Sequence, residues 1–149
     1  MKNFFDQADA ASIISRVQHI NPASTPHWGK MTAAQMLAHC NAAMEMALGK
    51  KQVKRAWFSY LVGWLAKPMF LNEKPFPKGL PTDPSLLAGD GNGVEEEKNK
   101  LIGQIQELAS GGPGVVTTAA HSFFGKLTAE QWARGMYKHL DHHLQQFGV

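Results

Sequence analysis

Histidines near the end of the sequence have the residue type and spacing of a metal site. His139 and His143 stand four residues apart, so on a helix both side chains project from one face, one turn apart. Neutral imidazoles in this arrangement ligate transition metals in several metalloenzymes. The HxxxH spacing also arises by chance, so a third ligand on another helix is needed to strengthen the interpretation.

His39 is the candidate for that third ligand, because its depth along its own helix matches the depth of His139 and His143 along theirs. It lies about 9 Å from the start of a helix predicted to begin at Thr32. The midpoint of His139 and His143 lies about 9 Å before the end of the last predicted helix. If the two helices run antiparallel, the three imidazoles meet, and we predict a divalent transition metal there, zinc or nickel.

Two further histidines lie near these candidate ligands in sequence. His142 follows His139 by three residues, so a small rotation of the helix would let it replace a ligand, although its position points mostly outward. His121 precedes the last helix, and two interpretations stay open for it. It forms a polar wall or proton carrier of the site, or it is a loop histidine that fixes the backbone after it.

Three more polar residues lie one helical turn from, or next to, a predicted ligand. Gln35 and Gln146 are candidates for orienting the imidazoles, since ligating histidines need a hydrogen-bond partner at the other ring nitrogen. Cys40 adjoins His39, but consecutive helical residues differ by about 100° in direction. We therefore expect Cys40 to be a small buried thiol and not a ligand.

Apolar residues recur at helical spacing in most of the chain and predict an all-α fold. Four main helices are expected, and an extra one lies in the connection between the second and the third. The segment 115–119 is a candidate strand, and the Pro- and Gly-rich segment 72–93 is predicted to be irregular. In chain order, the first two main helices are expected at about 6–19 and 32–47. The third runs from a cap at Asn92 to the SGGPG stretch at 110–114, and the fourth covers 128–147.

Helix-start signals support two of these helices. Thr32 with Gln35, and Thr128 with Gln131, have the capping-box spacing, in which a hydroxyl and an amide satisfy free backbone donors. Glycines that can adopt the left-handed conformation follow both helices, at Gly49 and Gly148.

The extra helix is predicted from apolar positions between Val53 and Leu65 and is expected to end near Pro68. Its apolar run is too short to span a bilayer, although its basic flank would suit a helix lying on a membrane surface. We expect instead that Trp57, Trp64 and Leu65 are buried against the other helices or a second subunit, so the sequence allows a homodimer.

Length and composition limit the class of protein. A chain of 149 residues fits a single domain, 1–149, and can bury a proper core. Cys40 is the only cysteine and the N-terminus lacks a signal-peptide pattern, which favours a cytoplasmic location. The net charge of +3 is modest and no nucleic-acid-reading motif is found, so no nucleic-acid partner is expected.

Two stretches resemble the DinB-like superfamily of metal-binding helical bundles, and look closest to a branch of small bacterial proteins of unknown function. They are WGKMTAAQMLAHC, from Trp28 to Cys40, and HSFFGKLTAEQWARGMYKHLDHHLQQFG, from His121 to Gly148. The KPFPKGLPTDP segment resembles that branch as well, so the likeness covers most of the chain.

This resemblance implies a four-helix bundle in up-down-down-up order, whose metal is held by one histidine of the second helix and two of the last. On this sequence the matching residues are His39, His139 and His143. Members of the superfamily include transferases and isomerases that use low-molecular-weight thiols.

Two classes of function follow. In the first, the metal activates a small-molecule thiol or water, in a thiol transferase or a hydrolase-like enzyme. No carboxylate base is evident near the histidines, which suits the thiol role better. In the second, the protein is a non-catalytic, metal-stabilised binding or interaction module. No catalytic residue is assigned.

Overall fold

The computed structural model describes residues 2–55, 57, 59–82, 86, 87, 89 and 91–149. Within this part of the chain all regular structure is helical, and the only β-type pairing is an isolated bridge between His121 and Gly125. The elements are α1 (Gln7–His19), α2 (Ala33–Ala47), α3 (Ser59–Leu71), α4 (Val94–Gly111), the short 3₁₀ helix η2 (Gly112–Val115) and α5 (Ala129–Gln146). The prediction of an all-α fold is confirmed for the described residues.

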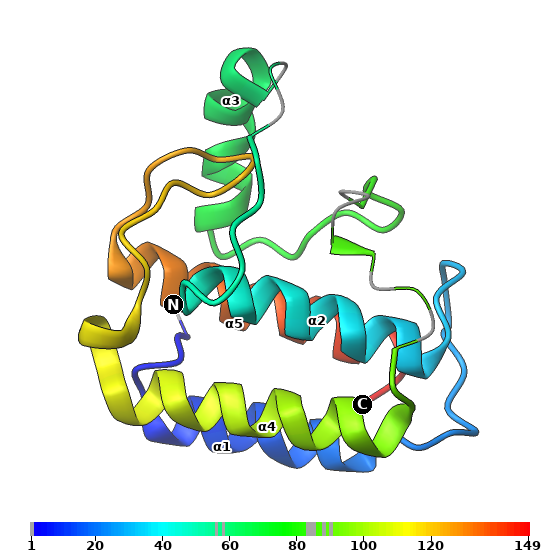
Figure 1. Cartoon of the computed structure of the whole chain (residues 1–149). Helices are drawn as coiled ribbons and strands as arrows, with labels where there is room; N and C mark the ends of the chain where they lie inside the picture. Colours follow the sequence, from blue (N-terminus) through cyan, green and yellow to red (C-terminus); the bar gives the residue numbers. More distant parts are fainter. Residues whose placement is uncertain (1, 56, 58, 83–85, 88, 90) are drawn as a thin grey trace.

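Four of these helices, α1, α2, α4 and α5, lie side by side, and we call them the helical body (Figure 1). α2 packs against α4 and α5, and α1 packs against the same two helices. Figure 1 shows that α1 and α5 run in one direction and that α2 and α4 run in the opposite one. α2 and α5 are therefore antiparallel, as the matched depth of the histidines requires.

The core of the helical body is filled by large apolar side chains from each of its helices. The largest fully buried ones are Phe4, Ile13, Ile20, Met36, Leu37, Met44, Leu101, Ile105, Leu108, Trp132, Met136 and Leu140. Burying a side chain of this size stabilises the fold by about 1.5 to 3 kcal/mol.

Side-chain caps fix where α2 and α5 begin. Both predicted capping boxes are present, at Thr32 with Gln35 and at Thr128 with Gln131. Each box satisfies two backbone donors that a helix start leaves free, and a lost cap costs about 1 kcal/mol. These caps set the positions of α2 and α5 along the chain, and with them the positions of the histidines.

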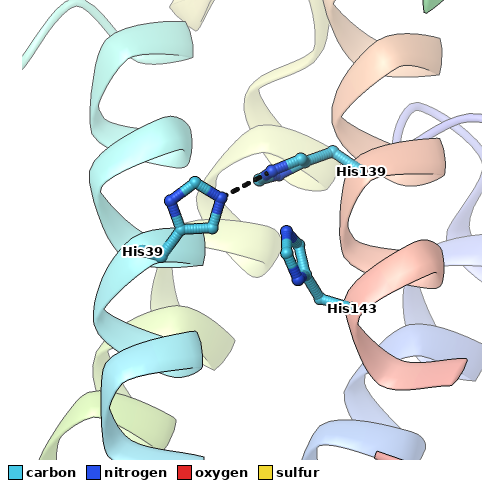
Figure 2. Close-up of side chains that lie close together, drawn as sticks. All are labelled: His39, His139 and His143. Carbon is cyan, nitrogen blue, oxygen red and sulfur yellow. Dashed lines mark hydrogen bonds between the residues drawn. The ribbon is translucent and has the colours of Figure 1, made fainter. Parts of the chain in front are cut away.

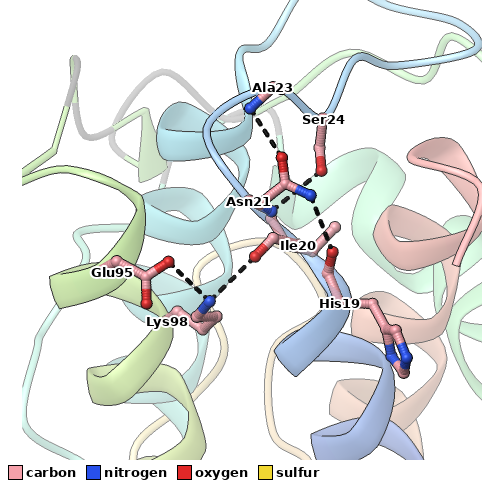
Figure 3. Close-up of polar contacts among 7 residues, drawn as sticks. All are labelled: His19, Ile20, Asn21, Ala23, Ser24, Glu95 and Lys98. Carbon is pink, nitrogen blue, oxygen red and sulfur yellow. Dashed lines mark hydrogen bonds and ion pairs between the residues drawn. The ribbon is translucent and has the colours of Figure 1, made fainter.

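The connection after α1 is tied to the start of α4 (Figure 3). The Lys98 ammonium donates to the Ile20 carbonyl oxygen at 3.1 Å and pairs with the Glu95 carboxylate at 2.8 Å. Asn21 closes the turn itself. Its side-chain oxygen accepts from the Ala23 backbone amide, and its backbone amide donates to the Ser24 hydroxyl. The loop that leads into α2 is thereby held against α4.

The extra helix differs from its prediction. α3 begins at Ser59, after the predicted apolar positions Val53 and Trp57, and continues through Pro68 to Leu71, past its expected end near Pro68. Proline removes one intrahelical hydrogen bond and does not end this helix. At its C-terminal end, Lys138 of α5 donates to the carbonyl oxygens of Met69 and Asn72, two of the acceptors that a helix end leaves free.

The expected burial of the α3 side chains against the helical body is also wrong. Trp57, Trp64 and Leu65 are 76%, 67% and 62% exposed. α3 stands away from the body, and among the other helices its main contact is with α5 (Figure 1). That contact centres on Phe70, whose ring lies so close to Gly135 that a Cβ there would be 2.0 Å from it.

Two smaller predictions also fail. The N-cap of α4 is Gly93 and not Asn92, whose backbone amide donates to the buried Glu97 carboxylate instead. The segment 115–119 forms no strand, since it continues from η2 into irregular structure. Among the described residues, no helix combines the length and apolar character needed to cross a membrane.

Candidate metal centre

Three imidazoles face one another between α2 and α5. His39 comes from α2, and His139 and His143 come from successive turns of α5 (Figure 2). One ring nitrogen from each lies within 4.8 Å of those of the other two. The three histidines singled out by spacing and depth are therefore brought together.

The hydrogen bonds of His39 and His143 determine which nitrogens point inward. His39 Nδ1 lies 3.1 Å from the Leu86 carbonyl oxygen. Because a carbonyl oxygen can only accept, Nδ1 carries the proton and donates it. The Nε2 atom of the neutral His39 ring therefore has its lone pair directed toward the other two histidines.

Gln146 fixes His143 in the same way. Its amide nitrogen donates to the Trp28 carbonyl oxygen at 2.6 Å, so its amide oxygen must be the atom that faces His143. His143 Nδ1 lies 3.0 Å from that oxygen and donates to it. This leaves the Nε2 lone pair of His143 for the site, as expected of an imidazole oriented by an outer partner.

His139 completes the group. Its Nε2 atom lies 2.9 Å from Nε2 of His39, and two nitrogens at this separation need a proton or a cation between them. Its other ring nitrogen, Nδ1, is buried and has no hydrogen-bond partner among the described residues. His139 thus differs from the other two in having nothing that fixes its outer nitrogen.

The environment keeps the imidazoles of His139 and His143 neutral. Burial lowers the pKa of His139 well below its usual value, and the nearby rings of His143 and His39 lower it further. Burial, with the proximity of His39, lowers the pKa of His143 to about 3, although the hydrogen bond to Gln146 opposes this shift. Neutral imidazole is the form that binds a metal.

The group fits a divalent transition metal in its chemistry and its dimensions. Zinc binds imidazole nitrogen at about 2.0 to 2.1 Å, which places tetrahedral nitrogen ligands about 3.3 Å apart. The observed separations, from 2.9 Å to at most 4.8 Å, bracket that value. Three nitrogen donors without a carboxylate or thiolate could hold such an ion and leave a position open.

The remaining predicted residues lie in different places. His142 is outside the three-histidine group; its half-buried ring contacts the rings of Trp28 and Phe76, with centroids 5.9 and 5.7 Å away. Gln35 uses its side-chain oxygen in the capping box of α2, where it accepts from the Thr32 amide.

His121 fixes the loop after it, as one of its two interpretations expects, and the other interpretation, a polar wall or proton carrier of the site, stays a prediction. Its Nδ1 atom accepts from the backbone amides of Phe123 and Phe124 at 3.0 and 3.3 Å, so this nitrogen holds the turn before α5. Its ring packs between Phe124 and Trp132, with centroids 4.7 and 5.0 Å away.

Cys40 is buried, as expected. Its sulfur contacts Met36, and burial raises the pKa of the thiol far above its usual value. A thiol with so high a pKa does not supply the thiolate needed of a nucleophile or a ligand.

Two supporting groups were missed by the sequence analysis, the carbonyl oxygens of Leu86 and Trp28. Any residue has a carbonyl, so the residue type at these positions gives no signal. Both lie in irregular segments, whose path the helical periodicity does not reveal.

Comparison with known proteins gives a single finding. Searches of curated proteins and of solved structures find no match. The family model described as "Protein of unknown function (DUF1569)" matches residues 3–148, which is nearly the whole chain. The chain therefore belongs to the DUF1569 family.

Proposed function

We propose that this protein binds one divalent transition metal ion, zinc or nickel, through Nε2 of His39, His139 and His143. The convergence of the three imidazoles carries the proposal, because two of them have their outer nitrogens anchored so that the inner lone pairs face one another. A core histidine with a purely structural role needs no such arrangement.

We also propose that the helical body is an up-down-down-up four-helix bundle of the DinB-like type. The helix directions in Figure 1 support this, since α1 and α5 oppose α2 and α4. The long connection between α2 and α4, which carries α3, supports it as well. So does the origin of the ligands, one from the second helix and two from the last.

The activity that this site supports best is transfer of a low-molecular-weight thiol, with hydrolysis as the related alternative. When bound, the ion would act as a Lewis acid and lower the pKa of a thiol or water at its open position. The three-histidine group contains no carboxylate, and Asp141 is held away from it in an ion pair with Arg16 at 2.6 Å. A hydrolase would need a base to activate water, whereas a thiol loses its proton more readily.

The test is His139→Ala, with His142→Ala as the matched control. The first change removes one of three ligands and should abolish metal retention and any metal-dependent thiol transfer. The fold should remain, because α5 is held by its apolar side and its capping box. His142→Ala should keep the metal. The measurements are metal content after gel filtration and a screen of small thiols against electrophiles with zinc or nickel.

Melting temperature with and without chelator separates this proposal from a metal-stabilised binding module. The burial of His39 and His143 favours the module as the second candidate, since a buried ion would be part of the core. A large drop in melting temperature with chelator, together with an empty thiol screen, would support the module. Loss of metal in His142→Ala would show that the proposed ligand set is incorrect.

A further inference from the structure

Trp57 and the N-terminal part of α3 expose a cluster of large apolar side chains, which we call the α3 tip. It consists of Trp57, Tyr60, Leu61, Val62, Trp64 and Leu65, which are 43 to 76% exposed. Contiguous apolar patches are uncommon on the surface of a monomer that has no partner, and they mark interaction sites. Trp57, Trp64 and Leu65 do not pack on the helical body, and their burial against a second subunit stays a prediction, so the question becomes what contacts these side chains.

The exposed side chains spread around the helix and do not form one flat stripe. At about 100° per residue, positions 60 to 65 cover roughly half of the circumference. The opposite side carries Ser59 and Gly63, which are buried against the 121–125 loop. There the backbones approach closely, since a Cβ at Gly63 would lie 2.1 Å from the Phe123 carbonyl oxygen. A helix that exposes apolar side chains over half of its circumference is covered better by a deformable partner that surrounds it. A flat protein surface would contact only one side.

The sequence around the α3 tip carries only positive charge, and of its cations Lys50 is paired with Glu107. Between residues 46 and 72 the sequence contains five lysines and arginines and no aspartate or glutamate. Lys54 is exposed just before the tip. The Arg55 guanidinium lies 4.0 Å from the centroid of the Tyr60 ring, which places a cation beside an apolar side chain of the tip. A partner that fits both features has an apolar interior and an anionic surface.

We propose that the α3 tip docks on the surface of an anionic lipid bilayer. Tryptophan and tyrosine favour the headgroup level, and cations next to them attract anionic lipids. From Ser59 to Leu65 the helix rises about 9 Å, so a tip that enters end-on reaches the depth of about 5 to 10 Å at which the apolar faces of in-plane interfacial helices lie. The helical body, with its three histidines, remains outside the lipid because α3 stands away from it (Figure 1).

The test is flotation of the full-length protein with vesicles of phosphatidylcholine alone or with about 30% phosphatidylserine. The protein should float with the anionic vesicles and much less with the neutral ones, and added salt should weaken binding. Trp57→Ser with Trp64→Ser should abolish flotation. The matched control is Leu80→Ser, which changes an exposed apolar side chain outside the tip. Lys54→Gln should lower the partition coefficient about fivefold, equivalent to about 1 kcal/mol per cation.

Three outcomes would overturn the proposal. The first is absence of flotation with anionic vesicles at low salt. The second is flotation that survives the double serine variant unchanged. The third is a dimer in analytical ultracentrifugation that the double serine variant converts to monomer while neither form binds vesicles, which would identify a second copy of the chain as the cover. Unchanged melting temperature in the double variant ensures that lost flotation does not reflect lost folding.

Discussion

The space between α2 and α5 and the tip of α3 depart from the usual distribution of side chains in opposite ways. Between α2 and α5, three imidazoles lie in or at the edge of an apolar core. At the α3 tip, two tryptophans and four other apolar side chains face water. Folded chains normally bury large apolar side chains, and they bury histidine less often.

Both departures work against folding stability, the buried histidines below pH about 6.5 and the α3 tip at any pH. The lowered pKa values of His139 and His143 show that the core disfavours their charged form, while the α3 tip loses the stabilisation that burial of its apolar side chains would provide. Residues with these properties are therefore better explained by what they bind than by what they hold together. The three histidines present lone pairs to a cation, and the α3 tip presents apolar surface to a binding partner.

The sharpest way to test the α3 side of the contrast is to change one buried and one exposed aromatic residue of the same helix. Phe70 is buried, with its ring 4.4 Å from that of Phe124, whereas Trp64 is exposed. Phe70→Ala should lower the free energy of unfolding by about 3 to 5 kcal/mol, because a cavity replaces a packed ring. Trp64→Ala should change it by less than about 0.5 kcal/mol, as is usual for surface substitutions. Denaturant unfolding measures both, and an equal loss for Trp64→Ala would mean that the α3 tip packs on the body.

The buried histidines should make the metal-free protein sensitive to acid. Below pH about 6.5 the unfolded chain takes up protons at His139 and His143, whereas the folded chain does not until much lower pH. The unfolded state therefore binds more protons, and the free energy of unfolding falls as the pH falls. Between pH 7.5 and 5 the expected loss is about 2 kcal/mol for each of the two histidines.

This loss can be measured by denaturant unfolding at several pH values with chelator present. His143→Ala should remove about half of the pH dependence and serves as the control. Stability that stays constant between these pH values would contradict the burial of neutral imidazoles.

A smaller effect is expected from the side chain that orients His143. Gln146→Met should weaken zinc binding by tenfold to a hundredfold, since partners of ligating histidines typically contribute that much. Gln145→Met is the matched control, because Gln145 is exposed and bonds to Asp141 instead. Competition titration with a chromophoric chelator measures the affinity. Equal affinities of the two variants would mean that the hydrogen bond from His143 to Gln146 does not support the site.

The sequence predicted the three-histidine group because every step of that argument depends on helical geometry. The capping boxes at Thr32 and Thr128 mark where two helices begin, and the rise per residue then gives the depth of each histidine. Only the antiparallel arrangement had to be assumed. The same reasoning identified Gln146, which lies one turn from His143.

Features that depend on irregular chain segments could not be predicted in this way. The Leu86 carbonyl reaches His39 from the connection before α4, whose path has no period that a sequence would reveal. The exposure of Trp57 and Trp64 was missed for another reason. An apolar run indicates that its side chains will be buried, but it does not say whether they are buried by the same chain or by another molecule.

The close packing of Phe70 on Gly135 forms a contact that acts as a pivot for α3. From Phe70 to Ser59 the helix is about 16 Å long, so a change of 10° at the pivot would move its far end by about 3 Å. Any side chain at position 135 would collide with the Phe70 ring and force such a change. The missing Cβ at Gly135, together with the packing of Ser59 and Gly63 on the 121–125 loop, therefore sets the angle at which α3 leaves the body, and with it the distance between the three histidines and whatever the α3 tip touches.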